Sequence, residues 1–194
     1  LVVAAHPDDE VLGCGATIAK YASLGYDIYV VIATNANKGA PELFDKKSIS
    51  SVREEAKKAH KILGVKKTIF LELPAPALDQ YPLYKIALKF NKVISQIKPK
   101  KLFIPHPGDI HIDHLKTYQA SLVAARPINN NNIKSIYCYE TLSETEWSPI
   151  SSNKTFIPNH FIDVSGEPFE KKIEAMKCFN SQIKIFPHPR SLET

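Results

Sequence analysis

The chain has 194 residues, 44% hydrophobic and 23% charged, which is the composition of a globular protein long enough for one domain with its own core. It contains no apolar run near the ~18 residues that a membrane-spanning helix needs, and LVVAA followed at once by HPDDE is too short and lacks the basic start of a signal peptide. The net charge of +5 comes mainly from lysine-rich stretches that we interpret as solvated helix faces, without a nucleic-acid-binding motif. We therefore expect no membrane span and no nucleic-acid partner.

Along the chain, short β-branched apolar runs alternate with amphipathic stretches, and this alternation predicts strands that alternate with helices. The expected strands are residues 1–6, 27–35, 67–73, 101–106 and 135–141, with a further one near 160–165. The expected helices are residues 10–24, 52–63, 82–98, about 114–126 and 167–182. Helices of this length between strands form right-handed βαβ crossovers. The pattern thus predicts a three-layer α/β domain with a mainly parallel sheet.

Several local signals refine these boundaries. Ser51 and Glu54 form a capping-box pattern at the expected start of the second helix, and residues 129–132 form a polar linker. The cysteines Cys14, Cys138 and Cys178 are widely spaced, odd in number and without a C-x-x-C pair. This usage favours reduced thiols and a cytoplasmic location over a disulfide framework.

Acidic residues and histidines gather directly after two of the expected strands. H-P-D-D-E at residues 6–10 follows the first strand, and H-P-G-D-I-H-I-D-H at residues 106–114 follows the fourth. Ligands of open α/β sheets bind beyond the carboxyl ends of the strands, so we expect both clusters at one edge of the sheet. So many acids in one place would repel one another without a cation.

Two histidines and one carboxylate are a ligand set that suits catalytic zinc (Zn²⁺), which keeps an open position for water. The candidate ligands are His6, Asp9 and either His111 or His114, and Fe²⁺ or another divalent metal fits the same set. Each residue alone also has an ordinary explanation, since an Asp after a strand often caps a helix and a lone loop His is usually a surface residue. The presence of two such clusters at corresponding strand ends favours a metal site.

The sequence gives little support for a nucleotide-binding site or for a side-chain nucleophile. Gly13 and Gly15 do not form a dinucleotide-binding motif, because Ile18 stands at the third glycine position and the acids of HPDDE would repel a pyrophosphate. We expect these glycines to allow close packing of the helix. Cys14 is expected to be a core thiol, and there is no G-x-S-x-G elbow, so a metal-activated water is the best nucleophile.

The motif A-H-P-D-D-E-x-x-G-C-G, together with the distal H-x-D-H, resembles the PIG-L/LmbE-like family of zinc-dependent N-acetylglucosaminyl deacetylases. Further matches run along the whole chain: V-R-E-E-A-x-x-A-x-x-I-L-G-V, Y-x-Y-E-T, K-x-x-A-x-x-C-F-x-S-Q and P-H-P-R-S. The resemblance implies a Rossmann-like fold and hydrolysis of the acetamido group of an N-acetylated amino sugar. The partner would be a small-molecule or glycoconjugate substrate.

The resemblance also assigns roles by motif position. It implies that His6, Asp9 and His114 are the zinc ligands and that Asp8 is the general base. His111 would assist as an acid or oxyanion stabiliser, and Asp113 would orient His111 through a hydrogen bond. Arg53 stands where the family often has a substrate-facing arginine.

The loop after the third expected strand and the ends of the chain depart from the family pattern. The family commonly carries an acid soon after the proline of that loop, where this chain has its acid later, at Asp79. His188, in the tail, has no assigned role. Family members usually continue beyond P-H-P-R-S, and this chain begins inside its first strand. Residues 1–194 are therefore expected to form a single deacetylase domain truncated at both ends.

Two alternatives stay open: a metal-binding or sugar-binding module that has lost catalysis, and a hydrolase of a non-sugar amide or ester. Asp8 argues against the first, because a binding site needs ligands but no free base. The sequence carries no signal that identifies the sugar or the oligomeric state.

Overall fold

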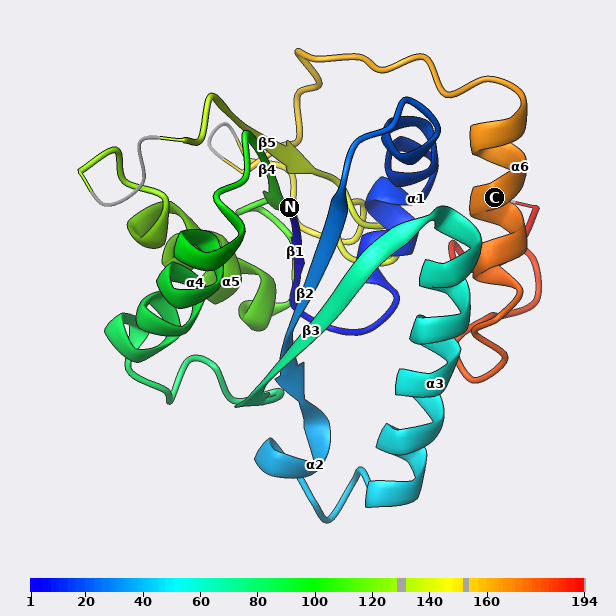
Figure 1. The fold of residues 1–194 in the computed structure, drawn as a ribbon. Coiled ribbons are helices and arrows are strands. Elements are labelled where there is room, and N and C mark those ends of the chain that lie inside the picture. The colour runs from blue at the N-terminus through cyan, green and yellow to red at the C-terminus, as the bar shows by residue number, and fades with distance from the viewer. Residues whose placement is uncertain (129–131, 152–153, 194) are drawn as a thin grey trace.

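The computed structural model describes residues 1–128, 132–151 and 154–193. In these residues a parallel sheet lies between two layers of helices, as Figure 1 shows. Its strands are β1 (Val2–Ala4), β2 (Ile28–Asn35), β3 (Val65–Pro74), β4 (Lys101–Pro105) and β5 (Ser135–Tyr139). The order across the sheet is β3-β2-β1-β4-β5, so the connections run outward in opposite directions from β1 and β4. A reversal of this kind is where α/β sheets form their ligand crevice.

The helices cover both faces of the sheet and confirm the expected three-layer α/β fold (Figure 1). One face carries α1 (Asp9–Ser23), α3 (Lys46–Leu63) and α6 (Glu167–Met176), and the other carries α4 (Leu83–Ile97) and α5 (Ile112–Ala124). The short helix α2 (Ala36–Gly39) follows β2. Because successive side chains of a strand point to opposite faces, Val2 and Ala4 of β1 pack in the core beneath α1 while Val3 packs in the core beneath α4. Burial on both faces explains why the central strands β1, β2 and β4 are mostly apolar.

The boundaries of two helices differ from the prediction. Helix α3 begins at Lys46, because the Asp45 side chain accepts a hydrogen bond from the Ser48 N–H (2.7 Å) and caps the helix earlier in the chain. The capping box predicted at Ser51 is therefore wrong, although Gly64 ends the helix in the left-handed conformation (φ 79°). Helix α6 ends at Met176 rather than near residue 182, and turns carry the chain onward.

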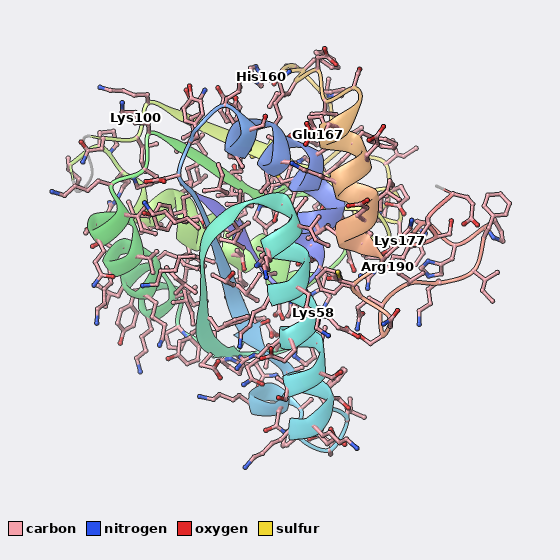
Figure 2. The ribbon with its side chains drawn as sticks, turned by 45° about the vertical axis from the view of Figure 1, so that its right-hand side comes forward. Lys58, Lys100, His160, Glu167, Lys177 and Arg190 are labelled. Atoms are coloured by element: carbon pink, nitrogen blue, oxygen red, sulfur yellow. The ribbon has the colours of Figure 1, made fainter. Side chains whose placement is uncertain are left out.

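The strand expected near 160–165 is also wrong, since this part of the described chain forms no strand. Phe161 is 79% exposed, and Ile162 packs against the core without joining the sheet. Of the polar linker at 129–132, residues 129–131 lie outside the described part of the chain. Charged side chains cover the outer surfaces, with Lys58 on α3, Glu167 at the start of α6 and Lys177 at its end (Figure 2). No described helix combines the length and the apolarity needed to cross a membrane.

Gly13 and Gly15 pack α1 closely against its neighbours. A Cβ on Gly13 would meet the ring of Tyr139 in β5 and would lie 2.5 Å from the carbonyl oxygen of Glu140. A Cβ on Gly15 would lie 2.9 Å from the flexible side chain of Lys172 in α6. Cys14, between them, is 2% exposed in the core. The expected packing role of the glycines and the core position of Cys14 are both confirmed.

We expect Gly13→Ala to destabilise the protein by about 1–3 kcal/mol, because the added methyl group overpacks the contact between α1 and the end of β5. Thermal unfolding followed by circular dichroism measures the loss. Ser23→Ala, at the exposed end of the same helix, is the control and should change stability by less than about 0.5 kcal/mol. A Gly13→Ala protein as stable as the parent would show that Tyr139 and Glu140 move aside without cost.

Candidate active site

The two clusters meet at the carboxyl edge of the sheet. Strands β1 and β4 are neighbours, so the HPDDE turn after β1 lies beside the loop that leads from β4 into α5. The ring centroid of His6 lies 4.4 Å from that of His111 and 5.3 Å from that of His114. The structure thus brings together residues that are more than a hundred positions apart, at the place where the sheet order reverses.

Asp9 and His114 form the buried centre of this group. The Asp9 Oδ2 atom accepts a hydrogen bond from the His6 backbone N–H (2.8 Å) and lies 3.1 Å from His114 Nε2 and 3.4 Å from His6 Nδ1. Among the described residues, Asp9 Oδ1 and His114 Nε2 are buried and unpaired by hydrogen bonds, although His114 Nε2 is in ion-pair contact with Asp9 Oδ2. A buried polar atom without a hydrogen bond costs about 1–3 kcal/mol, so these two side chains favour a bound ligand.

The electrostatics at this point favour a positive charge. Burial acts to lower the pKa of His6, but hydrogen bonds to Asp113 and Asp9 outweigh it and raise the pKa to about 9. The pKa of His114 is raised well above its usual value for the same reason, with Asp9 and Asp109 overcoming the effect of burial. The pKa of Asp9 is lowered well below its usual value, since His114 and His6 outweigh its burial. The same carboxylates would attract a divalent cation at this position.

Two overlapping sets of side chains bring their ligand atoms within 4.8 Å of one another: His6, Asp9 and His114, and His6, His111 and Asp113. In the second set, Asp113 Oδ1 already accepts from the Leu78 N–H (3.0 Å) and its Oδ2 lies 3.0 Å from His6 Nε2. The first set contains the two unpaired buried atoms. The His6–Asp9–His114 set therefore fits a metal better, and two imidazoles with one carboxylate are a usual set for catalytic zinc.

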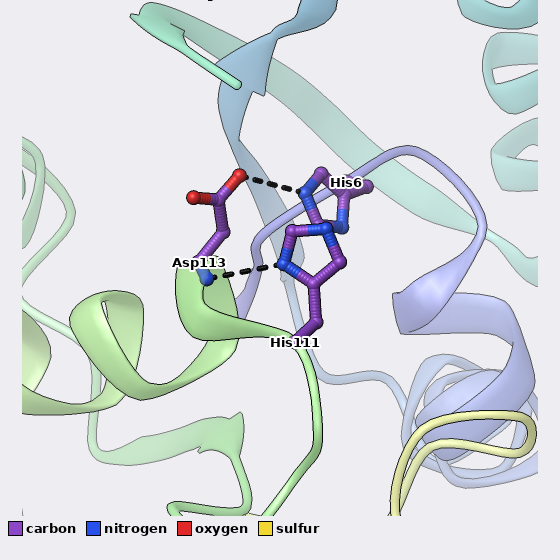
Figure 3. Close-up of side chains that lie close together, drawn as sticks. All are labelled: His6, His111 and Asp113. Carbon is purple, nitrogen blue, oxygen red and sulfur yellow. Dashed lines mark hydrogen bonds and ion pairs between the residues drawn. The ribbon is translucent and has the colours of Figure 1, made fainter. Parts of the chain in front are cut away.

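Two further carboxylates orient the histidines of this set. Asp109 Oδ2 lies 2.8 Å from His114 Nδ1 and its Oδ1 accepts from the Thr145 hydroxyl (2.7 Å). Asp113 does the same for His6, as Figure 3 shows. A carboxylate on one ring nitrogen directs the lone pair of the other nitrogen toward a metal. The expected hydrogen bond between Asp113 and His111 is present, but the Asp113 backbone N–H makes it, because the Asp113 carboxylate is bound to His6 and Leu78.

His111 is held instead by the backbone. Its Nδ1 accepts a hydrogen bond from the Asp113 N–H (3.1 Å), as Figure 3 shows, so the proton of the neutral ring lies on Nε2. Burial, helped by the charge of His6, lowers the pKa of His111 to about 4. The ring is thus a neutral hydrogen-bond donor at pH 7.

Asp8 occupies a distinct position at the start of α1. Its carbonyl oxygen accepts from the N–H groups of Val11 and Leu12 (2.9 Å each), and its φ of 112° is unfavourable for a residue with a Cβ, costing about 1–3 kcal/mol. Burial raises the pKa of Asp8 to about 8, opposed by Arg190 and reinforced by Asp9. A carboxylate whose pKa lies near neutral pH is suited to act as a general base.

The third acid of HPDDE is not part of the metal set. The Glu10 carboxylate binds His60 Nε2 (2.7 Å) and accepts from the Asp8 backbone N–H (3.2 Å). The adjacent acids thus have separate partners: Asp9 belongs to the metal set, Asp8 is paired with Arg190 and Glu10 is paired with His60. This division explains how three neighbouring acids are tolerated.

A cavity of about 430 Å³ lies at this edge of the sheet and reaches His6 and Asp8, whereas Asp9 and His114 lie behind its lining. The charged residues and histidines that line it are His6, Asp8, Arg53, His111, Glu144 and Arg190. Arg190 lies on the segment after α6 (Figure 2), and its guanidinium donates to Asp8 Oδ2 (3.1 Å) and to Ser143 Oγ (2.6 Å). The sequence analysis did not single out Arg190, although P-H-P-R-S contains it.

The remaining predicted residues lie around this cavity. Arg53 lines it, with its guanidinium bound to Glu72 and 4.7 Å from the ring centroid of Phe70. Asp79 is exposed and is not among the described residues that line the cavity. His188 accepts from the Arg190 backbone N–H (3.0 Å) and packs against Trp147, so it supports the segment that carries Arg190.

The fold and the site define a Rossmann-like α/β protein with a His/Asp group suited to a divalent metal. The chain belongs to the PIG-L family, described as GlcNAc-PI de-N-acetylase, whose family model matches residues 1–125. It is 35% identical to the uncharacterized deacetylase YaiS of Escherichia coli (strain K12), covering 93% of this chain and 90% of that protein. It is 26% identical to the diacetylchitobiose deacetylase of Thermococcus kodakarensis, covering 94% and 69%. These relatives support a deacetylase, and hence an amidohydrolase.

Solved structures show the same fold. The conserved protein TT1542 from Thermus thermophilus superposes with a TM-score of 0.77 at 23% identity, over 99% of this chain and 82% of that one. The 4-carboxy-2-hydroxymuconate hydratase GalB from Pseudomonas putida superposes with a TM-score of 0.71 at 23% identity, over 93% and 78%. Since one of these proteins is a hydratase, the fold alone does not determine the reaction.

Proposed function

We propose that this protein is a zinc-dependent hydrolase that removes the acetyl group from an N-acetylated amino sugar or its conjugate. The observation that carries the proposal is the His6–Asp9–His114 set, with its two unpaired buried atoms, beside a carboxylate that is not part of the set, Asp8. Membership of the PIG-L family and similarity to a diacetylchitobiose deacetylase support the sugar acetamide as substrate.

In the first half of the reaction, water attacks the amide carbonyl, and each residue of the site has a separate role. Zinc held by His6, Asp9 and His114 would act as a Lewis acid on the amide carbonyl and lower the pKa of water from 15.7 to about 7. Asp8 takes the proton of the attacking water as its oxygen bonds to the carbonyl carbon, and Arg190 holds the Asp8 carboxylate in place. The Nε2–H of His111 donates a hydrogen bond to the oxyanion that develops.

The second half of the reaction breaks the C–N bond. The protonated Asp8 carboxyl group gives its proton to the leaving nitrogen, so that acetate and a free amine are released and Asp8 returns to its carboxylate form. Because His111 Nδ1 accepts from a backbone N–H, the ring has one proton to donate and serves better as a hydrogen-bond donor than as a proton source. The structure thus favours the oxyanion role over the acid role for His111.

The surroundings of the site agree with this proposal. The cavity volume is within the range of about 300–1,000 Å³ that small-molecule sites occupy. The three cysteines all lie in the described part of the chain and none is in a disulfide, which supports a reducing compartment such as the cytoplasm.

Acetate release from a panel of N-acetylated amino sugars, beside a non-sugar acetamide and an acetate ester, tests the function. We expect acetate and free amine in equal amounts from one or more sugars, loss of release after chelation, and recovery with Zn²⁺. Parallel reconstitution with Fe²⁺ compares the two metals. Release from the non-sugar amide or the ester alone would establish the alternative hydrolase. A folded, zinc-loaded protein that releases acetate from no substrate would contradict the proposal and favour a binding module.

A further inference from the structure

A chain of hydrogen bonds leads from β3 through two helices to the backbone of Asp8. Thr68 Oγ1 in β3 lies 2.7 Å from His60 Nδ1 in α3, and His60 Nε2 lies 2.7 Å from Glu10 Oε1 in α1. The other carboxylate oxygen of Glu10 accepts from the Asp8 N–H at 3.2 Å. His60, Glu10 and Asp8 are all buried, so water does not compete with these contacts.

The directions of these hydrogen bonds follow from the chemistry of the groups. The Glu10 carboxylate accepts on both oxygens, so the proton between it and His60 belongs to His60 Nε2. In the neutral ring, His60 Nδ1 then accepts from the Thr68 hydroxyl. Every donor in this series of hydrogen bonds meets an acceptor, and this holds the side chains of His60 and Glu10 rigidly.

This series of hydrogen bonds ends at Asp8, whose backbone conformation is unfavourable. Asp8 has a φ of 112°, and such a conformation persists where its surroundings hold it. Its carbonyl oxygen is held by the first turn of α1, its carboxylate by Arg190 and its N–H by Glu10. The orientation of the Glu10 side chain depends in turn on His60, which holds the other oxygen.

We propose that His60 is a positioning residue for Asp8, acting through Glu10. The inference rests on the proposed function, in which Asp8 is the general base. His60 does not line the cavity that holds Asp8 and does not belong to either metal-binding set of the described residues, so its effect on turnover passes through the backbone of Asp8. The competing explanation is a buried polar pair that stabilises the contact between α1 and α3 and has no effect on the site.

Three variants separate these explanations. His60→Leu removes the donor to Glu10, and His60→Gln keeps an N–H at a similar reach. Leu63→Ala, in the next turn of α3, removes a fully buried core side chain that makes none of these hydrogen bonds. We expect His60→Leu to lower kcat by about ten-fold or more at unchanged KM and zinc content, because small displacements of a reacting group are costly. His60→Gln should recover most of kcat, and Leu63→Ala should lower Tm without changing kcat of the folded protein.

A second measurement does not depend on turnover. The ¹⁵N–¹H resonance of the Asp8 amide should move in His60→Leu, stay near its parental position in His60→Gln and be unaffected by Leu63→Ala. Parental kcat and an unmoved Asp8 amide in a folded His60→Leu protein would overturn the inference, as would equal losses of kcat in His60→Leu and Leu63→Ala at matched stability. If the parent protein itself releases no acetate, the proposed function fails, and the Asp8 resonance still tests the coupling to His60.

Discussion

Asp8→Asn is expected to lower acetate release by about 10²–10⁴-fold while the protein keeps its fold and its zinc. The asparagine oxygen still accepts from Arg190, so the contact that holds the side chain survives. What disappears is the ability to take a proton from water and to return it to the leaving nitrogen. Zinc content stays unchanged because Asp8 is not a member of the His6–Asp9–His114 set. Steady-state acetate release, with zinc measured by atomic spectroscopy on the same samples, tests this result.

The matched control is Asp79→Asn, which makes the same chemical change at an exposed acid outside the cavity. This variant should turn over like the parent. Asp8→Asn turnover within a few-fold of the parent would show that another group is the base. If Asp8→Asn instead lost zinc along with activity, Asp8 would be a ligand, and the assignment of the three acids in HPDDE would have to change.

The sequence predicted the parts of this protein that depend on local pattern. Apolar runs that alternate with amphipathic stretches predicted the parallel sheet. Because each acid-and-histidine cluster follows a strand, the sequence also predicted that both clusters lie at the same edge of the sheet. The sequence could therefore group His6 and Asp9 with either His111 or His114, and only the motif resemblance selected His114. Gly13 and Gly15 could be assigned to packing because the acids before them made nucleotide binding unfavourable.

Features that depend on which of several similar partners a side chain contacts could not be predicted. Asp113 follows His111 in the sequence by two positions, yet its carboxylate reaches His6 on another element, because the first turn of α5 points it toward the HPDDE turn. Asp109 and Glu10 each bind a histidine that local spacing does not identify. Arg190 reaches Asp8 across 182 positions, through turns after α6 whose first part, residues 177–182, the sequence pattern predicts as helix.

The second large effect is expected from Asp9→Asn, which should weaken zinc binding by at least about 100-fold, since even changes to residues behind metal ligands cost 10–100-fold. Asparagine can still accept from the His6 N–H, but it removes the negative charge that faces His6 and His114. In the parent protein, zinc at 100 times its dissociation constant should add about 2.7 kcal/mol of stability. For a domain of this size that is a rise in Tm of roughly 5–10 °C, and in Asp9→Asn the rise should fall to about 1–2 °C or less at the same zinc concentration.

The informative control for Asp9→Asn is His111→Asn, because His111 belongs to the competing set with His6 and Asp113. Zinc bound at His6, Asp9 and His114 predicts that His111→Asn keeps the zinc-dependent rise in Tm while Asp9→Asn loses most of it. Zinc bound at the competing set predicts the reverse. Asp9 Oδ1 and His114 Nε2 favour the first result, because a metal at the other set would leave both of these buried atoms without a hydrogen bond. Chelator competition on the two variants therefore identifies the set that binds zinc without any knowledge of the substrate.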